Sequence, residues 1–162
     1  MITCTFEDGG AGKLRHVIST ALILDGQKIL LTKRTAKLRE GGKWDLVGGF
    51  MNRDETVEES LRREVLEETG YQLISVELFT VIDYPYRKGS DWQNIGFVYV
   101  CKAGEKTGEA DWESTEQKWF NLDNLPPKQD LAFDHSEIIN LYLQNKNFTP
   151  LKLLSYKDSD EK

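Results

Sequence analysis

The chain has 162 residues, of which 39% are hydrophobic and 30% are charged. This composition is typical of a globular protein, and the length suits one domain with a sizeable core but not two ordinary domains. The formal net charge of −6 at pH 7 argues against a general polynucleotide-binding surface, because contacts with phosphates dominate that affinity. A small phosphorylated substrate is compatible with this charge, since bound cations can reverse the local field.

The sequence also disfavours membrane and secreted classes of protein. It contains no run of about 18 apolar residues, so we expect no membrane span. Its first residues lack the basic start and apolar core of a signal peptide. Cys4 and Cys101 make neither a disulfide framework nor a zinc-binding set. We therefore expect the protein to reside in the reducing cytoplasm.

The first predicted elements are strands. Residues 16–24 are rich in Val, Ile, Leu and Ala and predict a buried strand. The dipeptide Asp25-Gly26 is typical of a hairpin turn, which predicts a return strand over residues 28–33. A polar loop over residues 37–43 then leads to a short strand over residues 44–50.

The next segment has the start and the end of a helix over residues 57–69. Thr56 suits the N-cap, and Glu59 completes the capping-box pattern. Gly70 suits the end of the helix, because glycine readily adopts the left-handed conformation that ends many helices. Apolar residues recur every four positions and define the buried stripe of this helix: Val57, Leu61 and Val65.

The remainder of the chain alternates strands with one more helix. Three further strands and a second helix are predicted, over residues 73–83, 94–103, 116–121 and 136–144. The charged tail over residues 155–162 is expected to be disordered. Periodicity alone favours an α+β or an α/β protein and does not choose between them.

Three glutamates crowd the end of the predicted helix. Glu64, Glu67 and Glu68 fall within about one helical turn, and each like-charged pair costs roughly 0.2–0.5 kcal/mol even on an exposed helix. At about 100° per residue, Glu68 falls inside the apolar arc and Glu64 on its border. The alternative is an ordinary acidic helix that Arg62 and Arg63 neutralise, but it does not explain a glutamate among the apolar positions. A hard divalent cation, Mg²⁺ or Mn²⁺, would compensate this charge.

These residues belong to a longer pattern that resembles the signature of the Nudix hydrolase family. The pattern G-x5-E-x7-R-E-U-x-E-E-x-G-U, where U is aliphatic, is complete from Gly49 to Gly70 and departs only at Tyr71. Weaker likeness extends to the flanking segments 30–34, 43–50 and 116–120. The resemblance implies an α/β/α sandwich around a central mixed β-sheet, formed by one domain over residues 1–154.

The resemblance also implies a role for each residue of the signature. Gly49 would add its backbone carbonyl to a metal shell whose best direct ligands are Glu64 and Glu68. Glu67 would be either a ligand of a second ion or a hydrogen-bonding base. The remaining two signature residues, Glu55 and Arg63, resemble a pair that ties the loop to the helix, and a plain structural ion pair is the alternative. The implied chemistry is attack of a metal-activated water on phosphorus in a diphosphate linkage.

Several residues outside the signature are candidates for the same site. Relatives often supply a further carboxylate from a later loop, and Glu113 and Glu116 are the candidates here, with a solvated loop charge as the alternative for each. Lys33 and Arg34 end a predicted strand near the site, where they could contact a terminal phosphate or simply lie on the surface.

The aromatic residues and histidines are less informative. Trp44 and Tyr84 are candidates for a platform that stacks on a base, although packing in the core or at its rim is the more common explanation. His16 and His135 lack a nearby partner motif, so the sequence gives neither a catalytic role.

The resemblance leaves the substrate open among nucleoside triphosphates, ADP-ribose-type sugars and similar small phosphorylated nucleotides. Pro85 lies close to the position that marks ADP-ribose-cleaving relatives, but one residue short of it. A nucleotide sensor that does not hydrolyse its ligand is the main alternative function. An isoprenoid diphosphate isomerase is a weaker one, because neither cysteine lies in a matching motif. Many relatives form dimers, so a homodimer is a further expectation.

Overall fold

The computed structural model describes residues 2–85 and 93–153. The predicted tail over residues 155–162 lies outside this part of the chain, as do residue 154 and residues 86–92. None of the described helices is long and apolar enough to cross a membrane.

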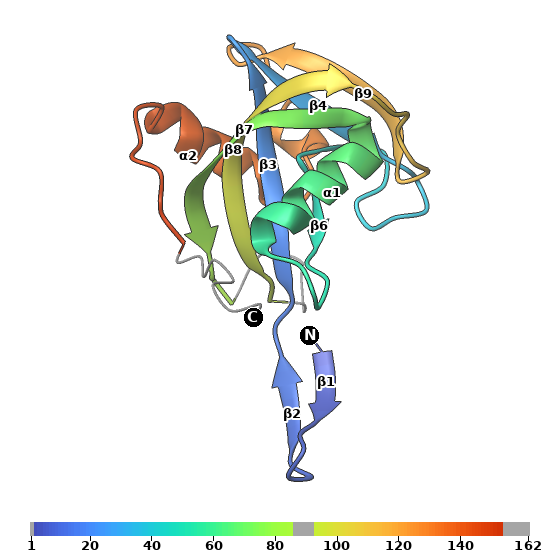
Figure 1. Ribbon diagram of the computed structural model, residues 1–162. Helices are drawn as coiled ribbons and strands as arrows, with labels where there is room; N and C mark the ends of the chain where they lie inside the picture. Colours follow the sequence, from blue (N-terminus) through green and yellow to red (C-terminus); the bar gives the residue numbers. More distant parts are fainter. Residues whose placement is uncertain (1, 86–92, 154–162) are drawn as a thin grey trace.

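One mixed β-sheet organises the described residues (Figure 1). Strands β5, β4, β3, β8 and β7 lie side by side in that order, while β6 also pairs with β3 and β9 with β4. The β3–β8 pair is parallel and the other pairs of this sheet are antiparallel. The strands are β3 (Val17–Asp25), β4 (Lys28–Arg34), β5 (Trp44–Asp45), β6 (Val47–Phe50), β7 (Tyr71–Ile82), β8 (Ile95–Lys106) and β9 (Ser114–Asn121).

Two helices cover opposite faces of the sheet. Successive residues of a strand point to opposite faces, and β3 illustrates the consequence. Ile23 packs in one core cluster with Leu61 and Val65 of α1 (Val57–Thr69), whereas Leu22 packs in the other with Ile138 of α2 (His135–Gln144). The layers are therefore α/β/α, with α1 and α2 on the two sides of β3 (Figure 1).

Helix α1 begins and ends where its caps predict. The Thr56 hydroxyl accepts a hydrogen bond from the backbone N–H of Glu59, and the Glu59 carboxylate accepts one from the backbone N–H of Thr56, at 3.2 and 2.7 Å. Gly70 has a left-handed φ of 76° and donates its N–H to the Leu66 carbonyl. The predicted stripe of Val57, Leu61 and Val65 faces the core, with Leu61 and Val65 buried and Val57 partly buried against the same cluster, and Glu68 is buried as well.

The predicted strand over residues 44–50 is interrupted. It consists of β5, which pairs with β4, and β6, which pairs with β3, with Leu46 between them. Gly48 allows β6 to approach β3, because a Cβ at this position would overlap the backbone carbonyl of Ser19. At Leu46 the chain thus changes its pairing partner from β4 to β3. The pattern of apolar residues does not predict this change.

An N-terminal hairpin was not expected from the sequence. Strands β1 (Ile2–Thr5) and β2 (Ala11–Leu14) form a separate two-stranded sheet that projects from the body of the molecule (Figure 1). Its exposed apolar side chains are Ile2, Phe6 and Leu14. A short 3-10 turn at Lys128–Asp130, also unpredicted, precedes α2.

The end of α1 generates a stability prediction. Gly70 and Gly26 both have positive φ, which costs an alanine about 1–2 kcal/mol, but only at Gly70 would the new Cβ overlap another atom, the carbonyl oxygen of Gly108. Gly70→Ala should therefore lose roughly 1–3 kcal/mol more unfolding free energy than Gly26→Ala. Urea unfolding of both variants measures the difference, and equal losses would contradict the packing described for this helix end.

Candidate active site

A cavity of about 430 Å³ opens beside α1 and the start of α2. Its volume is in the range of small-molecule sites, and its wall combines apolar residues with charged ones. Strands β3 and β6, helix α1 and the first residue of α2 all contribute to it. The signature residues that line it are Gly49, Arg63 and Glu64.

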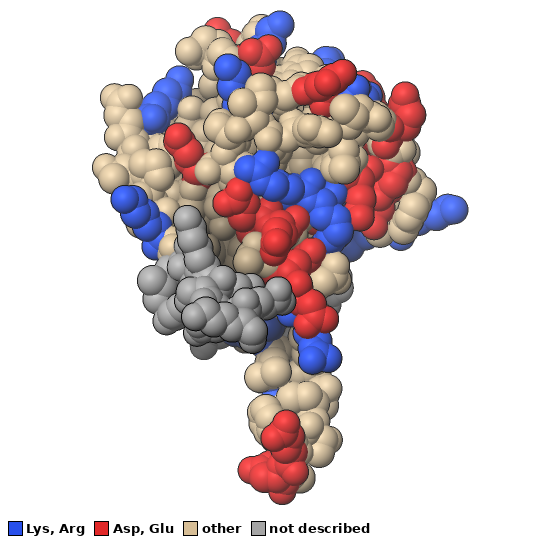
Figure 2. All heavy atoms as spheres, viewed as in Figure 1, with Lys and Arg blue, Asp and Glu red and all other residues tan. Residues whose placement is uncertain are grey.

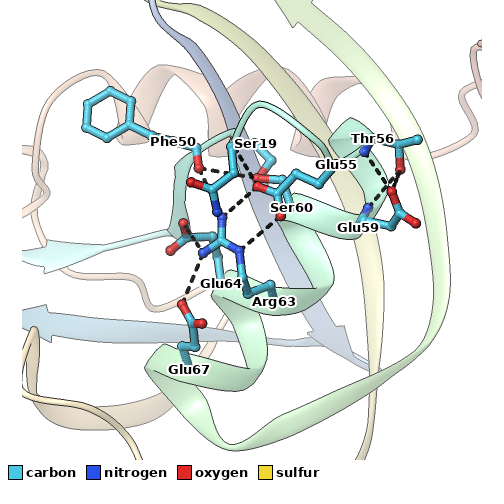
Figure 3. A network of polar contacts seen from close by, with 10 residues as sticks. Ser19, Phe50, Glu55, Thr56, Glu59, Ser60, Arg63, Glu64 and Glu67 are labelled. Carbon is cyan, nitrogen blue, oxygen red and sulfur yellow. Dashed lines mark hydrogen bonds and ion pairs between the residues drawn. The ribbon is translucent and has the colours of Figure 1, made fainter.

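Arg63 connects the carboxylates of the signature (Figure 3). Its guanidinium lies 2.8 Å from Glu55, 2.8 Å from Glu64 and 3.1 Å from Glu67, and it also donates to the backbone carbonyl of Phe50 at 3.1 Å. The hydrogen bonds from Arg63 are the main reason that the pKa of Glu55 falls to about 2. Arg63 therefore ties the loop that precedes α1 to the helix, as expected from the resemblance.

Glu64 lies against the backbone of β6. A Cβ placed on Gly49 would overlap the Glu64 carboxylate, so glycine at this position gives the carboxylate its place beside the strand. Burial raises the pKa of Glu64, although Arg63 opposes the shift, and the charges of Glu67 and Glu113 raise it further. A partly buried carboxylate against a strand backbone offers the oxygen ligand that a hard cation prefers, and the cation would offset its desolvation.

Glu68 is the most buried carboxylate of the three, with 8% of its surface exposed. It accepts a hydrogen bond of 3.3 Å from the backbone N–H of Gly48. Burial, followed by the charges of Asp45 and Glu64, raises its pKa well above the usual value. No Lys or Arg of the described residues forms an ion pair with it. The ionised form of Glu68 is therefore a buried charge for which the protein itself provides little compensation.

The two candidate carboxylates of the later loop differ in position. Glu113 lines the cavity, and its pKa is raised by burial and by Asp111, with Glu67 among the further causes. It also contributes to the raised pKa values of Glu64 and Glu68. Glu116 is exposed on β9 and does not line the cavity. The structure thus brings Glu113, but not Glu116, to the signature carboxylates.

The donor set suits a divalent cation. Within residues 2–85 and 93–153, no three Asp, Glu, His or Cys side chains converge tightly enough to define a metal site by themselves. The partly buried Glu64 and the buried Glu68 nevertheless both have raised pKa values beside the Gly48–Gly49 backbone, and the charge of Glu64 contributes to the raised pKa of Glu68. A cation of the Mg²⁺ type, which takes only one or two protein carboxylates and completes its shell with water and phosphate, fits these residues.

A second polar cluster in the cavity wall was not identified from the sequence. Asp45 of β5 forms an ion pair with Arg34, and its other oxygen lies 2.5 Å from Nδ1 of His135. The Arg34 guanidinium also lies 5.0 Å from the ring of Phe133. All four residues line the cavity. Asp45 and His135 are ninety positions apart in the chain, so no local spacing pattern could have paired them.

The other candidates outside the signature lie away from the cavity lining. Lys33 has its ammonium 5.6 Å from the ring of Trp44, and Trp44 packs edge-on against Phe120 at the border of the core. Tyr84 is 58% exposed. Lys33, Trp44 and Tyr84 are therefore not brought together with Glu64, whereas Arg34 is on the wall of the same cavity.

A comparison with known families agrees with the signature. The model of the NUDIX domain matches residues 14–142. The chain belongs to the Nudix family.

Curated relatives of this Nudix protein include enzymes with different substrates. It is 37% identical to an ADP-ribose pyrophosphatase of Methanocaldococcus jannaschii over 142 residues, which is 83% of this chain and 80% of that protein. It is 29% identical to the oxidized purine nucleoside triphosphate hydrolase of Mus musculus, over 82% of this chain and 83% of that protein. A nudix hydrolase of Caenorhabditis elegans matches at 34% identity, but the match spans only 33% of that protein.

Solved structures confirm the Nudix α/β/α sandwich. One is a bifunctional NMN adenylyltransferase/ADP ribose pyrophosphatase from Francisella tularensis, complexed with AMP and a Mn ion. It aligns with a TM-score of 0.68 at 26% identity, over 83% of this chain and 42% of the other.

The buried charge of Glu68 generates a pH prediction. Because its folded-state pKa is raised above the unfolded value of 4.5, the ionised group destabilises the folded protein above the folded pKa, and this penalty vanishes below the unfolded pKa. In EDTA, Glu68→Gln should therefore raise the unfolding free energy at neutral pH and lose this advantage below about pH 4.5. Urea unfolding across pH measures the effect.

The matched control is Glu58→Gln, because Glu58 is an exposed glutamate on the same helix. This substitution should leave the pH dependence close to that of the unmodified protein. A Glu68→Gln variant that is less stable than the unmodified protein at neutral pH would contradict the description of Glu68 as an uncompensated charge.

Proposed function

We propose that this Nudix protein hydrolyses a diphosphate linkage in a small nucleotide derivative, with Mg²⁺ or Mn²⁺ as the cofactor. The observation that carries the proposal is the position of Glu68 and Glu64. Both carboxylates are withdrawn from water beside the Gly48–Gly49 backbone; Glu64 lines a cavity large enough for a nucleotide, and Glu68 lies behind that lining, bonded to the N–H of Gly48. Buried charge of one sign is costly unless a counter-ion joins it, which supports a cation as part of the working site.

Glu64, Glu68 and the carbonyl of Gly49 would hold this cation. When bound, it would lower the pKa of a coordinated water and shield the charge of the diphosphate. Glu67 is half exposed and contacts Arg63, so it can accept a proton from water or contact a second ion. Its contact with Arg63, which also holds Glu64, keeps it near the proposed cation ligands, and kinetic measurements of Glu67 variants would distinguish the two roles.

Arg63 and Glu55 would act by positioning these groups. Arg63 keeps Glu64 and Glu67 near one another, which offsets their repulsion and restricts their rotamers. Its further bond to the Phe50 carbonyl fixes α1 to the segment that ends β6. Glu55 in turn holds the guanidinium through two hydrogen bonds of 3.1 and 2.8 Å.

The substrate would be a nucleotide in which the diphosphate is joined to a further group. The two relatives that match over most of their length act on ADP-ribose and on oxidized purine nucleoside triphosphates, which supports a nucleotide and leaves both kinds open. The neighbour complexed with AMP and a Mn ion supports the cation. Arg34 and Phe133 on the cavity wall are suited to contact polar and flat parts of such a molecule.

The alternative function is a sensor that binds a nucleotide without hydrolysing it. The signature keeps all of its glutamates, which favours hydrolysis. A phosphate-release screen with Mg²⁺ over ADP-ribose, NADH, nucleoside triphosphates and dinucleoside polyphosphates separates the two. Tight binding with no product for any of them would favour the sensor.

The oligomeric state, the domain bounds and the cellular location of the protein remain predictions. A homodimer is supported by the projecting hairpin, because an isolated two-stranded hairpin is only marginally stable in water and its exposed Phe6 and Leu14 would gain from a partner surface. Light scattering of the unmodified protein and of Phe6→Asp tests it. A single domain over residues 1–154, a charged tail over residues 155–162 and a cytoplasmic location likewise remain predictions.

Cation dependence is the first kinetic prediction. EDTA should abolish turnover, and Mg²⁺ or Mn²⁺ should restore it. Glu68→Gln should lower kcat/KM by about 10²–10³-fold, because it removes charge from the group that would hold the cation. Glu58→Gln, the same substitution elsewhere on α1, should have a near-normal rate. Full turnover in EDTA would refute the proposed cofactor.

The later loop gives a second kinetic prediction with its own control. Glu113 faces the site and Glu116 does not, so Glu113→Gln should lower kcat/KM by about 10-fold or more, whereas Glu116→Gln should change it by less than about twofold. Rate measurements at saturating Mg²⁺ compare the two variants. Equal effects would remove Glu113 from the set of groups that act on the substrate.

A further inference from the structure

His135 has a more specific environment than a packed core histidine requires. It is 6% exposed, stands at the first position of α2 and lines the cavity. Its Nδ1 lies 2.5 Å from Oδ1 of Asp45 and 3.0 Å from the backbone nitrogen of Leu46, which donates to it. Because Nδ1 accepts the Leu46 N–H, the proton of a neutral His135 ring lies on Nε2, and the two contacts at one edge of the ring restrict its orientation.

Asp45 is held in place from two sides. Its side chain is 5% exposed, with one oxygen paired with Arg34 and the other facing His135. Burial would raise the pKa of Asp45, but His135 and Arg34 outweigh burial and keep that pKa below its usual value. The ionised Asp45 carboxylate and the Leu46 N–H therefore together restrict where the His135 ring can lie.

A role as a tether for α2 does not account for this pair. Leu131 already forms a β-bridge with Trp44, and the N–H of Ala132 donates to the Trp44 carbonyl at 2.8 Å. The backbone thus ties the segment before α2 to β5 without His135. A buried ion pair contributes little net stability, because desolvation offsets the attraction between its two members. A pair of apolar side chains would therefore serve a purely structural purpose at least as well.

The same cavity wall has unmet capacity for hydrogen bonds. The buried Oδ1 of Asn94, a lining residue, accepts no hydrogen bond within the described residues. Buried acceptors in folded proteins are nearly always satisfied, by protein groups, by water or by a bound molecule, so this wall can accept a donor from a ligand.

We propose that His135, oriented by Asp45, hydrogen-bonds the part of the nucleotide that lies beyond the cleaved diphosphate and determines which substrates are accepted. The proposal rests on the proposed function for its reaction, but it makes a separate claim about selectivity. The ligand group is an uncharged hydroxyl or amino group, because the charge of Arg34 is already paired with Asp45. It belongs either to a sugar or to a base, and Phe133 offers a flat surface beside it.

The experiment uses two substitutions that preserve different nitrogens of the ring. An asparagine side chain reaches about as far as Nδ1, so His135→Asn keeps the contacts with Asp45 and Leu46 but lacks Nε2. A glutamine side chain reaches about as far as Nε2, so His135→Gln keeps the group that would face the substrate. Asp45→Asn removes the orienting charge at constant volume. His16→Asn is the matched control at the other of the chain's two histidines.

Values of kcat and KM for ADP-ribose, ATP and CTP with Mg²⁺ provide the readout, with the urea midpoint as the measure of folding. His135→Asn should keep the midpoint and change a selectivity ratio by about 10-fold, mainly through KM. A change in the ADP-ribose/ATP ratio identifies a sugar contact, and a change in the ATP/CTP ratio identifies a base contact. His135→Gln should retain part of the selectivity, Asp45→Asn should shift the same ratio as His135→Asn, and His16→Asn should leave every ratio unchanged.

Two results would overturn the proposal. One is an equal loss of kcat/KM for all three substrates with a lowered urea midpoint, which is the effect of a structural tether. The other is an unchanged set of ratios in His135→Asn. If the unmodified protein hydrolyses none of the three, the proposed function fails separately. The role of His135 is then decided by calorimetry, from the ratios of the affinities for ADP-ribose, ATP and CTP.

Discussion

The close contact between α1 and the Gly48–Gly49 segment of β6 is the constraint on which the rest of the site depends. The Glu64 carboxylate lies where a side chain at position 49 would otherwise be, which requires glycine there, and the Glu68 carboxylate accepts the backbone N–H of Gly48. Gly48 is constrained on its other side as well, because β3 approaches it closely. Helix α1, strand β6 and strand β3 therefore fix one another's positions. The close packing of their backbones determines where the charged side chains lie.

Arg63 divides the charge of α1 into a compensated and an uncompensated part. Acidic side chains gather over α1 on the face that Figure 2 shows. The guanidinium of Arg63 neutralises Glu55 and shares its charge between Glu64 and Glu67 (Figure 3). Glu68 lies beyond its reach and keeps a strongly raised pKa. Stability alone would favour an apolar residue at this buried position. The helix instead keeps a charge that destabilises the folded state, which is characteristic of a group retained for binding.

The sequence predicted what local patterns encode. The caps at Thr56 and Gly70 and the stripe of apolar residues gave the limits of α1 and the burial of Glu68, because each depends on residues within one or two helical turns. The interruption of the strand at Leu46 depends on which neighbours its two halves pair with, and the hairpin of residues 2–14 has little apolar alternation. Neither feature produces a periodic pattern of apolar residues in the sequence.

The candidate site also combines residues that local patterns predict with residues that only the tertiary structure brings together. Residues of the signature were found by spacing, whereas the contrast between Glu113 and Glu116 depends on how the loop before β9 enters the sheet. The pair of Asp45 and His135 depends on α2 returning to β5 after the whole sheet has formed. Most of the groups that we propose for hydrolysis therefore lie in one contiguous segment of the chain, whereas the wall that we propose for selectivity is assembled from distant segments. Under this proposal, substitutions in the distant segments would change the preferred substrate while leaving the signature residues undisturbed, and the relatives that share the fold do differ in substrate, as an ADP-ribose pyrophosphatase and an oxidized purine nucleoside triphosphate hydrolase.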